Sequence, residues 1–302
     1  MKTHTPAISD GRNEVSTYVG MSSTVPVQAS TDAQVVNMWL HGKSPATQKS
    51  YHWETLRFAE HVGKPLRDVT LGDVQAYASS LEHYKPATQA RALAAVKSLF
   101  TFAHRIGYIA FDPAAVVQLP KRKDDLAARI MPEAAVQRIL ATTTGRNHAI
   151  VRLLYGAGLR AAELVGLRWK DVQPREDAGQ VTVYGKGGKT RAVKVSRTTW
   201  DTLEALRTDT TAADAPVFVS RKKHGQLTTV QVFRIVRDAA KNAGIPGNVS
   251  PHWLRHCHAS HALDRQCPIH LLQGTLGHAS VSTTSRYLHA RPDASSSEFV
   301  PA

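Results

Sequence analysis

The sequence has few cysteines and no long apolar run. Cys257 and Cys267 are the two cysteines among 302 residues, too few for a disulfide framework and without the spacing of a Cys-x-x-Cys site. No window reaches the roughly 18 consecutive apolar residues that a membrane span needs. The first fifteen residues lack the apolar core of a signal peptide. These absences exclude a disulfide-rich secreted domain and favour a protein of the reducing cytoplasm.

Acidic residues are scarce relative to basic ones. Asp and Glu number 24 against 38 Lys and Arg, so the net charge is +14 with histidine neutral. Residues 1–40 carry two basic and three acidic residues, residues 41–123 carry twelve and six, and residues 124–302 carry 24 and 15. The excess predicts a polyanionic partner, nucleic acid first and an anionic membrane surface second. The two basic segments, residues 41–123 and 124–302, could form a clamp around a duplex. They fit two unrelated solvated surfaces equally well.

Nucleotide and metal sites lack their usual residues. The glycines of residues 185–188 do not have the Gly-x-x-x-x-Gly-Lys-Ser/Thr spacing of a phosphate-binding loop. Residues 252–289 are rich in histidine, and pairs of histidines can bind zinc, but Cys257 and Cys267 lack the Cys-x-x-Cys spacing that commonly completes a zinc site. We therefore expect neither a cofactor nor a metal ion, and interpret His256, His258 and His261 as helix-packing or phosphate-contacting residues.

The composition is otherwise that of a globular chain, with 42% hydrophobic and 21% charged residues. Residues 31–118 show the signals of an all-helical domain. Pro45 follows a serine N-cap, Thr70 and Asp73 have the spacing of a capping box, and Pro86 opens a long helix whose apolar residues recur at three- and four-residue steps.

Residues 124–290 predict a second, mainly helical domain with a small antiparallel sheet. Residues 180–184 and 191–195 alternate around the glycine-rich segment 185–189, as in a β-hairpin, and helical patterns precede and follow them. The expected fold class is therefore mainly α.

Polar segments flank and separate the two expected domains. We interpret residues 1–30 as a flexible leader, residues 119–123 as an exposed basic linker and residues 291–302 as a C-terminal tail.

Four separate segments carry side chains of the kind that phosphate chemistry uses. One holds an arginine after Gly-x-Gly-Leu and one a lysine in a Gly-Lys-Gly-x-Lys-x-Arg hairpin. A third is His-x-x-Arg, whose ends share a helix face, and the fourth has Leu-Gly-His followed nine residues later by a tyrosine. The six residues are Arg160, Lys186, His252, Arg255, His278 and Tyr287. Each alone also fits an ordinary role, such as an ion pair of Arg160 with Glu163, a solvated loop lysine or a tyrosine at the rim of a core.

Taken together, the order and spacing of these segments resemble the tyrosine recombinase family, also called phage-type integrases, across residues 31–290. The most specific part is Leu-Gly-His-x-Ser-x-x-Thr-Thr-x-x-Tyr-x-His, matched throughout from Leu276 to His289. One departure is Ala162, where the family often has a serine that could cap the helix carrying Glu163, and a lost cap costs about 1 kcal/mol.

The resemblance implies a compact, Xer-like architecture, with a SAM-like core-binding domain at residues 31–118 and a catalytic domain at residues 124–290. It also implies the site: Tyr287 is the nucleophile, and the other five residues surround the scissile phosphate. Guanidinium groups suit the charge that develops on the non-bridging oxygens. His252 is then the natural proton acceptor for the tyrosine, Lys186 protonates the leaving 5′-oxygen, and His278 hydrogen-bonds a phosphoryl oxygen.

The activity that follows is site-specific recombination, in which duplex DNA is cut and rejoined through a 3′-phosphotyrosyl intermediate and a Holliday junction. The expected partners are double-stranded DNA with a specific site and a tetramer on two duplexes, formed by this chain alone or with a related recombinase. The expected location is the cytoplasm, at the nucleoid. Two alternatives stay open: DNA relaxation like that of a type IB topoisomerase, and a non-catalytic architectural DNA-binding protein.

Overall fold

The computed structural model describes residues 27–121, 125–185, 188–208, 211–221 and 225–288. The chain divides into two compact units, Met1–Lys123 and Asp124–Ala302. Several sequence-based expectations lie outside the described residues: residues 1–26 of the expected leader, residues 122–123 of the linker, Lys186, and the whole tail at residues 291–302.

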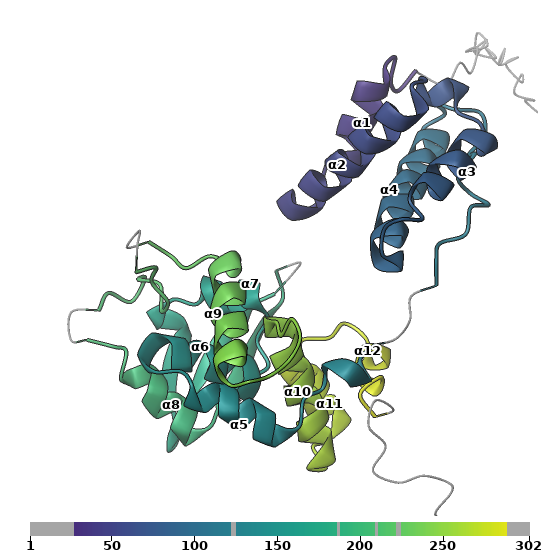
Figure 1. The fold of residues 1–302 in the computed structure, drawn as a ribbon. Helices are drawn as coiled ribbons and strands as arrows, with labels where there is room; N and C mark the ends of the chain where they lie inside the picture. The colour runs from purple at the N-terminus through teal and green to yellow at the C-terminus, as the bar shows by residue number, and fades with distance from the viewer. Residues whose placement is uncertain (1–26, 122–124, 186–187, 209–210, 222–224, 289–302) are drawn as a thin grey trace, which may run out of the picture. The chain divides into compact units, whose positions relative to one another are not determined.

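The first unit is a bundle of helices (Figure 1). Thr70 begins one of them as a capping box: its hydroxyl accepts a hydrogen bond from the Asp73 backbone N–H at 3.3 Å, and the Asp73 carboxylate accepts one from the Thr70 N–H at 2.9 Å. Pro45 lies in the first turn of another, after the Ser44 N-cap. These two expected helix starts are therefore confirmed, as is the third, at Pro86. The helices are α1 (Asp32–Leu40), α2 (Pro45–Val62), α3 (Leu71–Ser80) and α4 (Pro86–Arg105), with a short 3₁₀ helix η1 (Leu66–Asp68).

An aromatic cluster joins three helices of this unit. The Phe58 ring of α2 meets the Tyr77 ring of α3 edge-on, with 5.0 Å between centroids, and the Phe100 ring of α4 in the same way at 5.7 Å. All three side chains are buried. Edge-to-face aromatic pairs stabilise by about 0.5–1.5 kcal/mol beyond the apolar area that they bury, so this cluster fixes how the helices pack.

The second unit is also mainly helical. The part of this unit before the hairpin, where the sequence indicated a helical pattern, forms three helices, because left-handed glycines at Gly145 and Gly158 mark the turns between them. Helix α8 begins at the N-cap Ser196 and was not predicted. The helices are α5 (Glu133–Ala141), α6 (Gly145–Gly156), α7 (Ala161–Gly166), α8 (Arg197–Glu204), α9 (Thr229–Asn242), α10 (Pro251–Asp264), α11 (Ile269–Leu276) and α12 (Val281–Ser285), with 3₁₀ helices η2 (Ala127–Arg129) and η3 (Trp169–Asp171).

A three-stranded antiparallel sheet lies in this unit, in the order β1 (Val172–Arg175), β2 (Ala178–Tyr184), β3 (Thr190–Val195). The predicted hairpin is β2 and β3, with Val181 opposite Val193. The sequence did not indicate β1, because it is only four residues long and contains Pro174, a residue that sheets tolerate on an edge strand.

Helix α10 packs against α6 in the core of the second unit. Its Leu254 and Cys257 are fully buried there, while its Ala259 belongs to a smaller cluster with Leu276 and Tyr287. The mainly α fold class with a small antiparallel sheet is confirmed. Among the described residues, no helix combines the length and apolar composition that crossing a bilayer would take.

Candidate active site

The turn between α6 and α7 carries the first predicted residue, Arg160. Gly158 in this turn has φ +61°, and a Cβ there would lie 2.8 Å from the His258 ring and 2.9 Å from the Leu276 side chain. A glycine is therefore required, both by the left-handed backbone and by space. The Arg160 backbone N–H then donates to the Glu163 carboxylate at 2.9 Å. Helix α7 begins at Ala161, so Ala162 is its second residue and not its cap. The expectation of a lost cap at Ala162 was wrong, because Glu163 itself supplies the acceptor.

Glu163 ties two arginines to each other. Its Oε1 accepts from Arg160 Nη1 at 2.8 Å and from Arg191 Nη1 at 2.9 Å, and its Oε2 accepts from Arg191 Nη2 at 2.8 Å. Burial raises the pKa of Glu163, but the hydrogen bonds and charges of Arg191 and Arg160 outweigh it and lower the pKa to about 2. The ordinary ion pair of Arg160 with Glu163 therefore exists, and it holds Arg160 in place rather than excluding a functional role.

Arg255 is almost completely buried, with 2% of its surface exposed. Its Nη1 donates to the Gly158 carbonyl at 2.6 Å and its Nη2 to the Leu276 carbonyl at 2.7 Å. Burial, followed by the charge of Arg160, lowers the pKa of Arg255 to about 10, so the guanidinium stays charged at neutral pH. Two backbone carbonyls thus fix the plane of a buried cation beside Arg160.

His278 follows the end of α11. Gly277 closes that helix with φ +64°, a left-handed cap that redirects the chain. The Nδ1 of His278 lies 2.9 Å from the hydroxyl of Thr284, which is fully buried in α12. Burial, and then the charges of Arg255 and Arg160, lower the pKa of His278 to about 4. The ring is therefore neutral at neutral pH, and Thr284 sets its orientation.

Tyr287 lies just after α12 and is 6% exposed. Its hydroxyl is 2.8 Å from Nδ1 of His256, and its ring is parallel to the His278 ring with 6.5 Å between centroids. Burial raises the pKa of Tyr287, and the nearby charges of Arg255, Arg286 and Arg160 offset that rise only in part. The tyrosine is therefore protonated in this structure's environment and requires a proton acceptor to become a nucleophile.

His256 is the partner that sequence reasoning did not identify. Burial, followed by the charge of His252, lowers its pKa to about 4, so its ring is neutral. His252 stacks one turn earlier on α10, with 5.8 Å between ring centroids, and burial and the charge of Arg255 lower its pKa as well. Among the described residues, the hydrogen bond of the Tyr287 hydroxyl is made by His256 and not by His252, the expected proton acceptor.

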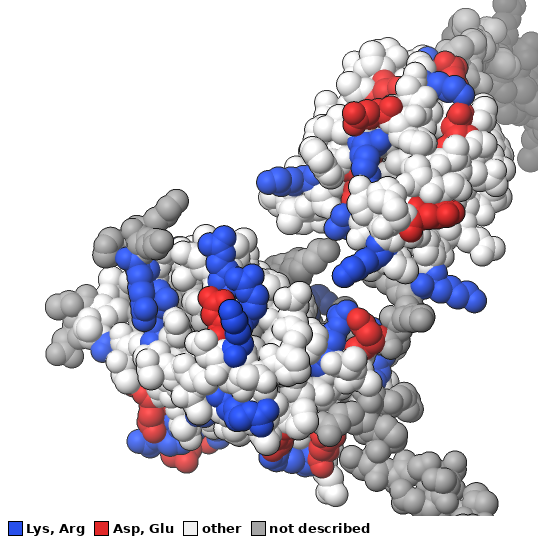
Figure 2. Space-filling view, viewed as in Figure 1, with Lys and Arg blue, Asp and Glu red and all other residues white. Residues whose placement is uncertain are grey.

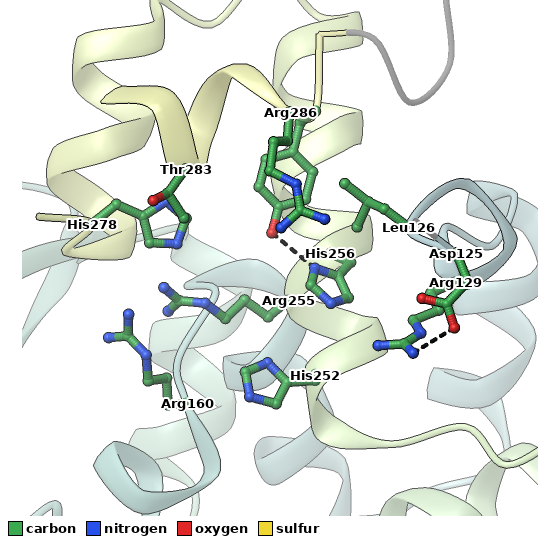
Figure 3. A pocket seen from close by; sticks show the side chains of 11 residues that line it. Asp125, Leu126, Arg129, Arg160, His252, Arg255, His256, His278, Thr283 and Arg286 are labelled. Atoms are coloured by element: carbon green, nitrogen blue, oxygen red, sulfur yellow. Dashed lines mark hydrogen bonds and ion pairs between the residues drawn. The ribbon is translucent and has the colours of Figure 1, made fainter. Parts of the chain in front are cut away.

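These side chains converge on one pocket of about 230 Å³ (Figure 3). Five of the six predicted site residues line it, from the α6–α7 turn, α10 and the segments after α11 and α12: Arg160, His252, Arg255, His278 and Tyr287. Arg129 and Arg286, which the sequence did not single out, add two further cations, and Arg129 is paired with Asp125 at 2.5 Å. The pocket is thus a strongly basic cavity with a tyrosine hydroxyl in its wall.

Lys186, the sixth predicted residue, lies outside the described residues, but its neighbours line a second cavity. This cavity, of about 880 Å³, shares Arg160 and His278 with the first and includes Gly185 and Lys189 of the β2–β3 hairpin. The ends of the hairpin loop therefore border the same arginine and histidine that line the pocket.

A further basic surface lies on α9. Figure 2 shows Lys and Arg side chains along the face of the second unit that carries α9, where Arg234, Arg237 and Lys241 are exposed. Within the parts of the chain that the structure describes, no group of three or more His, Cys, Asp or Glu side chains is arranged to hold a metal ion. The arrangement suits a phosphodiester, because its charged donors are arginines.

Comparisons with known proteins agree with this geometry. A protein-family model described as "Phage integrase family" matches residues 129–293 of the sequence. A second family model, described as "Phage integrase, N-terminal SAM-like domain", matches residues 33–105. The tyrosine recombinase XerD of Mycobacterium leprae is 32% identical over 272 residues, which cover 80% of this chain and 85% of the relative.

Two solved structures share the fold. A lambda integrase dimer bound to a core site has a TM-score of 0.70 at 18% identity and covers 88% of this chain and 98% of its own. A lambda integrase tetramer bound to a Holliday junction has a TM-score of 0.69 at 17% identity, and the match covers 86% of this chain and 77% of the integrase chain. The recombinase interpretation is confirmed, and neither the topoisomerase-like nor the non-catalytic alternative is favoured. From its family matches and its XerD relative, the chain belongs to the phage integrase family and is a tyrosine-type site-specific DNA recombinase.

Proposed function

We propose that Tyr287 is the nucleophile of this recombinase and that the pocket in front of it binds the scissile phosphate of a specific duplex DNA site. The observation that carries the proposal is the position of the Tyr287 hydroxyl, which shares a pocket of about 230 Å³ with Arg160 and Arg255. A phosphodiester under attack gains charge on its non-bridging oxygens, and fixed guanidinium groups in a partly dry site stabilise that charge.

Arg160 and Arg255 each bind a non-bridging oxygen in this proposal. Glu163 supports the first, at 2.8 Å, and the carbonyls of Gly158 and Leu276 support the second, so neither guanidinium needs to reorganise when the transition state forms. His278, held by the Thr284 hydroxyl, donates a hydrogen bond to the same phosphoryl group. We assign His252, which lines the pocket next to Arg255, to the phosphate as well.

Cleavage then exchanges one phosphate ester for another. The Tyr287 oxygen bonds to phosphorus, the bond from phosphorus to the 5′-oxygen breaks, and that oxygen receives a proton. We assign this proton to Lys186, because the ends of its hairpin loop, Gly185 and Lys189, line the adjoining cavity. The 3′-phosphotyrosyl bond conserves the energy of the broken ester, so a 5′-hydroxyl of another strand can reverse the step without ATP.

The assembly proposed is a tetramer on two duplexes that passes through a Holliday junction, formed by copies of this chain or together with a related recombinase. The fold shared with a lambda integrase tetramer on a Holliday junction supports it, as does the net charge of +14. We propose that it acts on DNA of the nucleoid in the cytoplasm.

A covalent-adduct experiment tests the assignment of Tyr287. DNA sites are first selected from a random pool with the full chain, and a nick is placed so that the cut strand loses a short fragment and cannot be religated. The chain should then form a denaturation-resistant complex with this DNA, and Tyr287→Phe should form none. Tyr155→Phe is the matched control, because Tyr155 also bonds a histidine of α10, His261, at 3.0 Å but does not line the pocket.

The outcomes separate the possible activities. An adduct with Tyr287→Phe at the rate of the unmodified chain would refute the nucleophile assignment. Relaxation of supercoiled DNA without exchange between two selected sites would point to the topoisomerase-like alternative, and binding without any adduct to an architectural protein.

A further inference from the structure

The Tyr287 hydroxyl is in contact with a histidine that lies outside the residues assigned so far. Nδ1 of His256 is 2.8 Å from the Tyr287 oxygen, both side chains line the same pocket, and both belong to one chain. We propose that His256 is the proton acceptor for Tyr287 during strand cleavage and the proton donor to the same oxygen during religation. This inference rests on the proposed nucleophilic role of Tyr287.

The position of the His256 ring is set by its neighbours on α10. Arg255, the residue before it, is anchored by the carbonyls of Gly158 and Leu276, and Cys257, the residue after it, is fully buried. The ring of His256 is 5.8 Å from the Tyr287 ring, measured between centroids. A base held within hydrogen-bond distance of the proton that it removes meets the geometric condition for general base catalysis.

The other two histidines of the pocket are less well placed for this proton. Nδ1 of His278 faces the Thr284 hydroxyl at 2.9 Å. His252 lies one turn before His256 and stacks on it with an angle of 24° between the rings, and the hydrogen bonds of the described residues do not join it to Tyr287. Of the three pocket histidines, His256 is the one with a nitrogen at hydrogen-bond distance from the Tyr287 hydroxyl.

The electrostatics of the pocket favour a neutral His256 until DNA arrives. Burial and the charges of His252, Arg129 and Arg255 keep its pKa at about 4, so Nδ1 carries a lone pair at neutral pH when the proton is on Nε2. A bound phosphate places negative charge in the same cavity, which stabilises the imidazolium that forms as the proton leaves Tyr287. The proton acceptor is thus available before the attack and is stabilised during it.

Two separate groups, His256 and Lys186, accept and donate the two protons that move in the step. As the Tyr287 oxygen bonds to phosphorus, its proton passes to Nδ1 of His256, and the departing 5′-oxygen takes a proton from Lys186. In religation the incoming 5′-hydroxyl returns its proton to Lys186, and the imidazolium of His256 returns the other to the tyrosine oxygen. No other reactant is needed.

Single-turnover cleavage of the nicked substrate tests the proposal. His256→Asn places an amide oxygen near the position of Nδ1 and so retains a hydrogen-bond acceptor without its basicity, whereas His256→Ala removes both. General acid–base catalysis typically contributes 10²–10⁴-fold, so we expect both variants to form the adduct at least about 100-fold more slowly. Their DNA affinity should stay within about threefold, because it depends on many phosphate contacts.

A sulfur substitution separates the acceptor from the donor. A substrate with sulfur in place of the bridging 5′-oxygen has a leaving group that needs little protonation. It should restore cleavage by Lys186→Ala and leave His256→Asn slow. Imidazole added to His256→Ala should restore part of the rate, because it can occupy the space of the missing ring.

His261→Asn is the matched control. His261 also lies on α10 and has its Nδ1 3.0 Å from a tyrosine hydroxyl, that of Tyr155, outside the pocket. Its cleavage rate should remain within about threefold of the unmodified chain. Thermal unfolding of all variants shows whether a rate loss comes from the fold.

Three results would overturn the role of His256: adduct formation by His256→Asn at the rate of the unmodified chain, a loss for His261→Asn equal to that for His256→Asn, or full recovery of His256→Asn on the sulfur substrate. The nucleophile assignment fails on different evidence, namely adduct formation by Tyr287→Phe, so the two failures are distinguishable.

Discussion

Glu163→Gln should destabilise the second unit, because Glu163 is the carboxylate shared by Arg160 and Arg191. The substitution keeps the size and shape of the side chain and removes its charge. It leaves two guanidinium groups, both within 2.9 Å of Oε1 in the native protein, without the anion that separates them. Removing one partner of a buried ion pair is strongly destabilising, because the charge left behind is not compensated.

The magnitude follows from the pKa of Glu163. The folded state lowers it from 4.5 to about 2, and each pKa unit corresponds to about 1.4 kcal/mol. The charged carboxylate therefore stabilises the native state by about 3 kcal/mol at pH 7. For a unit of 150–250 residues, a loss of that size lowers the melting temperature by roughly 6–12 °C.

The effect should depend on pH in a defined direction. The pKa is lower in the folded than in the unfolded state, so between pH 4.5 and about 2 the unfolded state binds more protons. The stabilisation is therefore fully present above that interval and is lost as the pH falls through it. At pH 3 the difference between the native chain and Glu163→Gln should shrink to about 1 kcal/mol.

The assay is urea unfolding at pH 7 and pH 3, followed by tryptophan fluorescence, to which Trp169, Trp200 and Trp253 of the second unit contribute. Glu133→Gln is the control, because Glu133 pairs with Arg265 at the surface, where ion pairs contribute no more than about 1 kcal/mol. A Glu163→Gln protein as stable as the native chain at pH 7, or a difference that does not shrink at pH 3, would refute the reasoning.

Two further predictions concern the loop lysine and the first glycine turn. Lys186→Ala should cleave ordinary DNA slowly and recover on the substrate with sulfur at the bridging 5′-position; equal impairment on both would assign Lys186 to positioning. Gly158→Ala should lose at least about 1 kcal/mol of stability and cleave more slowly, because its Cβ would lie 2.8 Å from His258 and its carbonyl holds Arg255. Gly166→Ala, whose Cβ would meet nothing within 4 Å, should unfold like the native chain, and an equal loss in both variants would contradict a steric cause.

Local signals in the sequence determined most of the helix starts and the hairpin. The capping residues Thr70 and Asp73 and the proline at position 45 act within one turn of chain, so neighbouring residues suffice to predict them. The same holds for the alternation around residues 185–189. Strand β1 was not predicted, because a four-residue segment that contains a proline carries no local β signal. It forms because it pairs with β2.

The motif spacing also indicated five residues that the fold brings into one pocket, but not how each is held. Glu163 bonds Arg191 across 28 positions, and Arg255 bonds the carbonyl of Gly158 across 97. Such contacts depend on how α7, α10 and β3 pack, which no local pattern encodes.

The same reason separates the two histidines of α10. His252 and His256 lie one turn apart on the same helix, and the sequence favours the one in the His-x-x-Arg motif as the partner of the tyrosine. Which of the two contacts the tyrosine depends on the path of the chain after α12, which brings the Tyr287 hydroxyl to 2.8 Å from Nδ1 of His256. The sequence by itself determined which kinds of side chain line the pocket. The tertiary structure decided which of them contacts the Tyr287 hydroxyl, because that contact spans 31 positions of the chain.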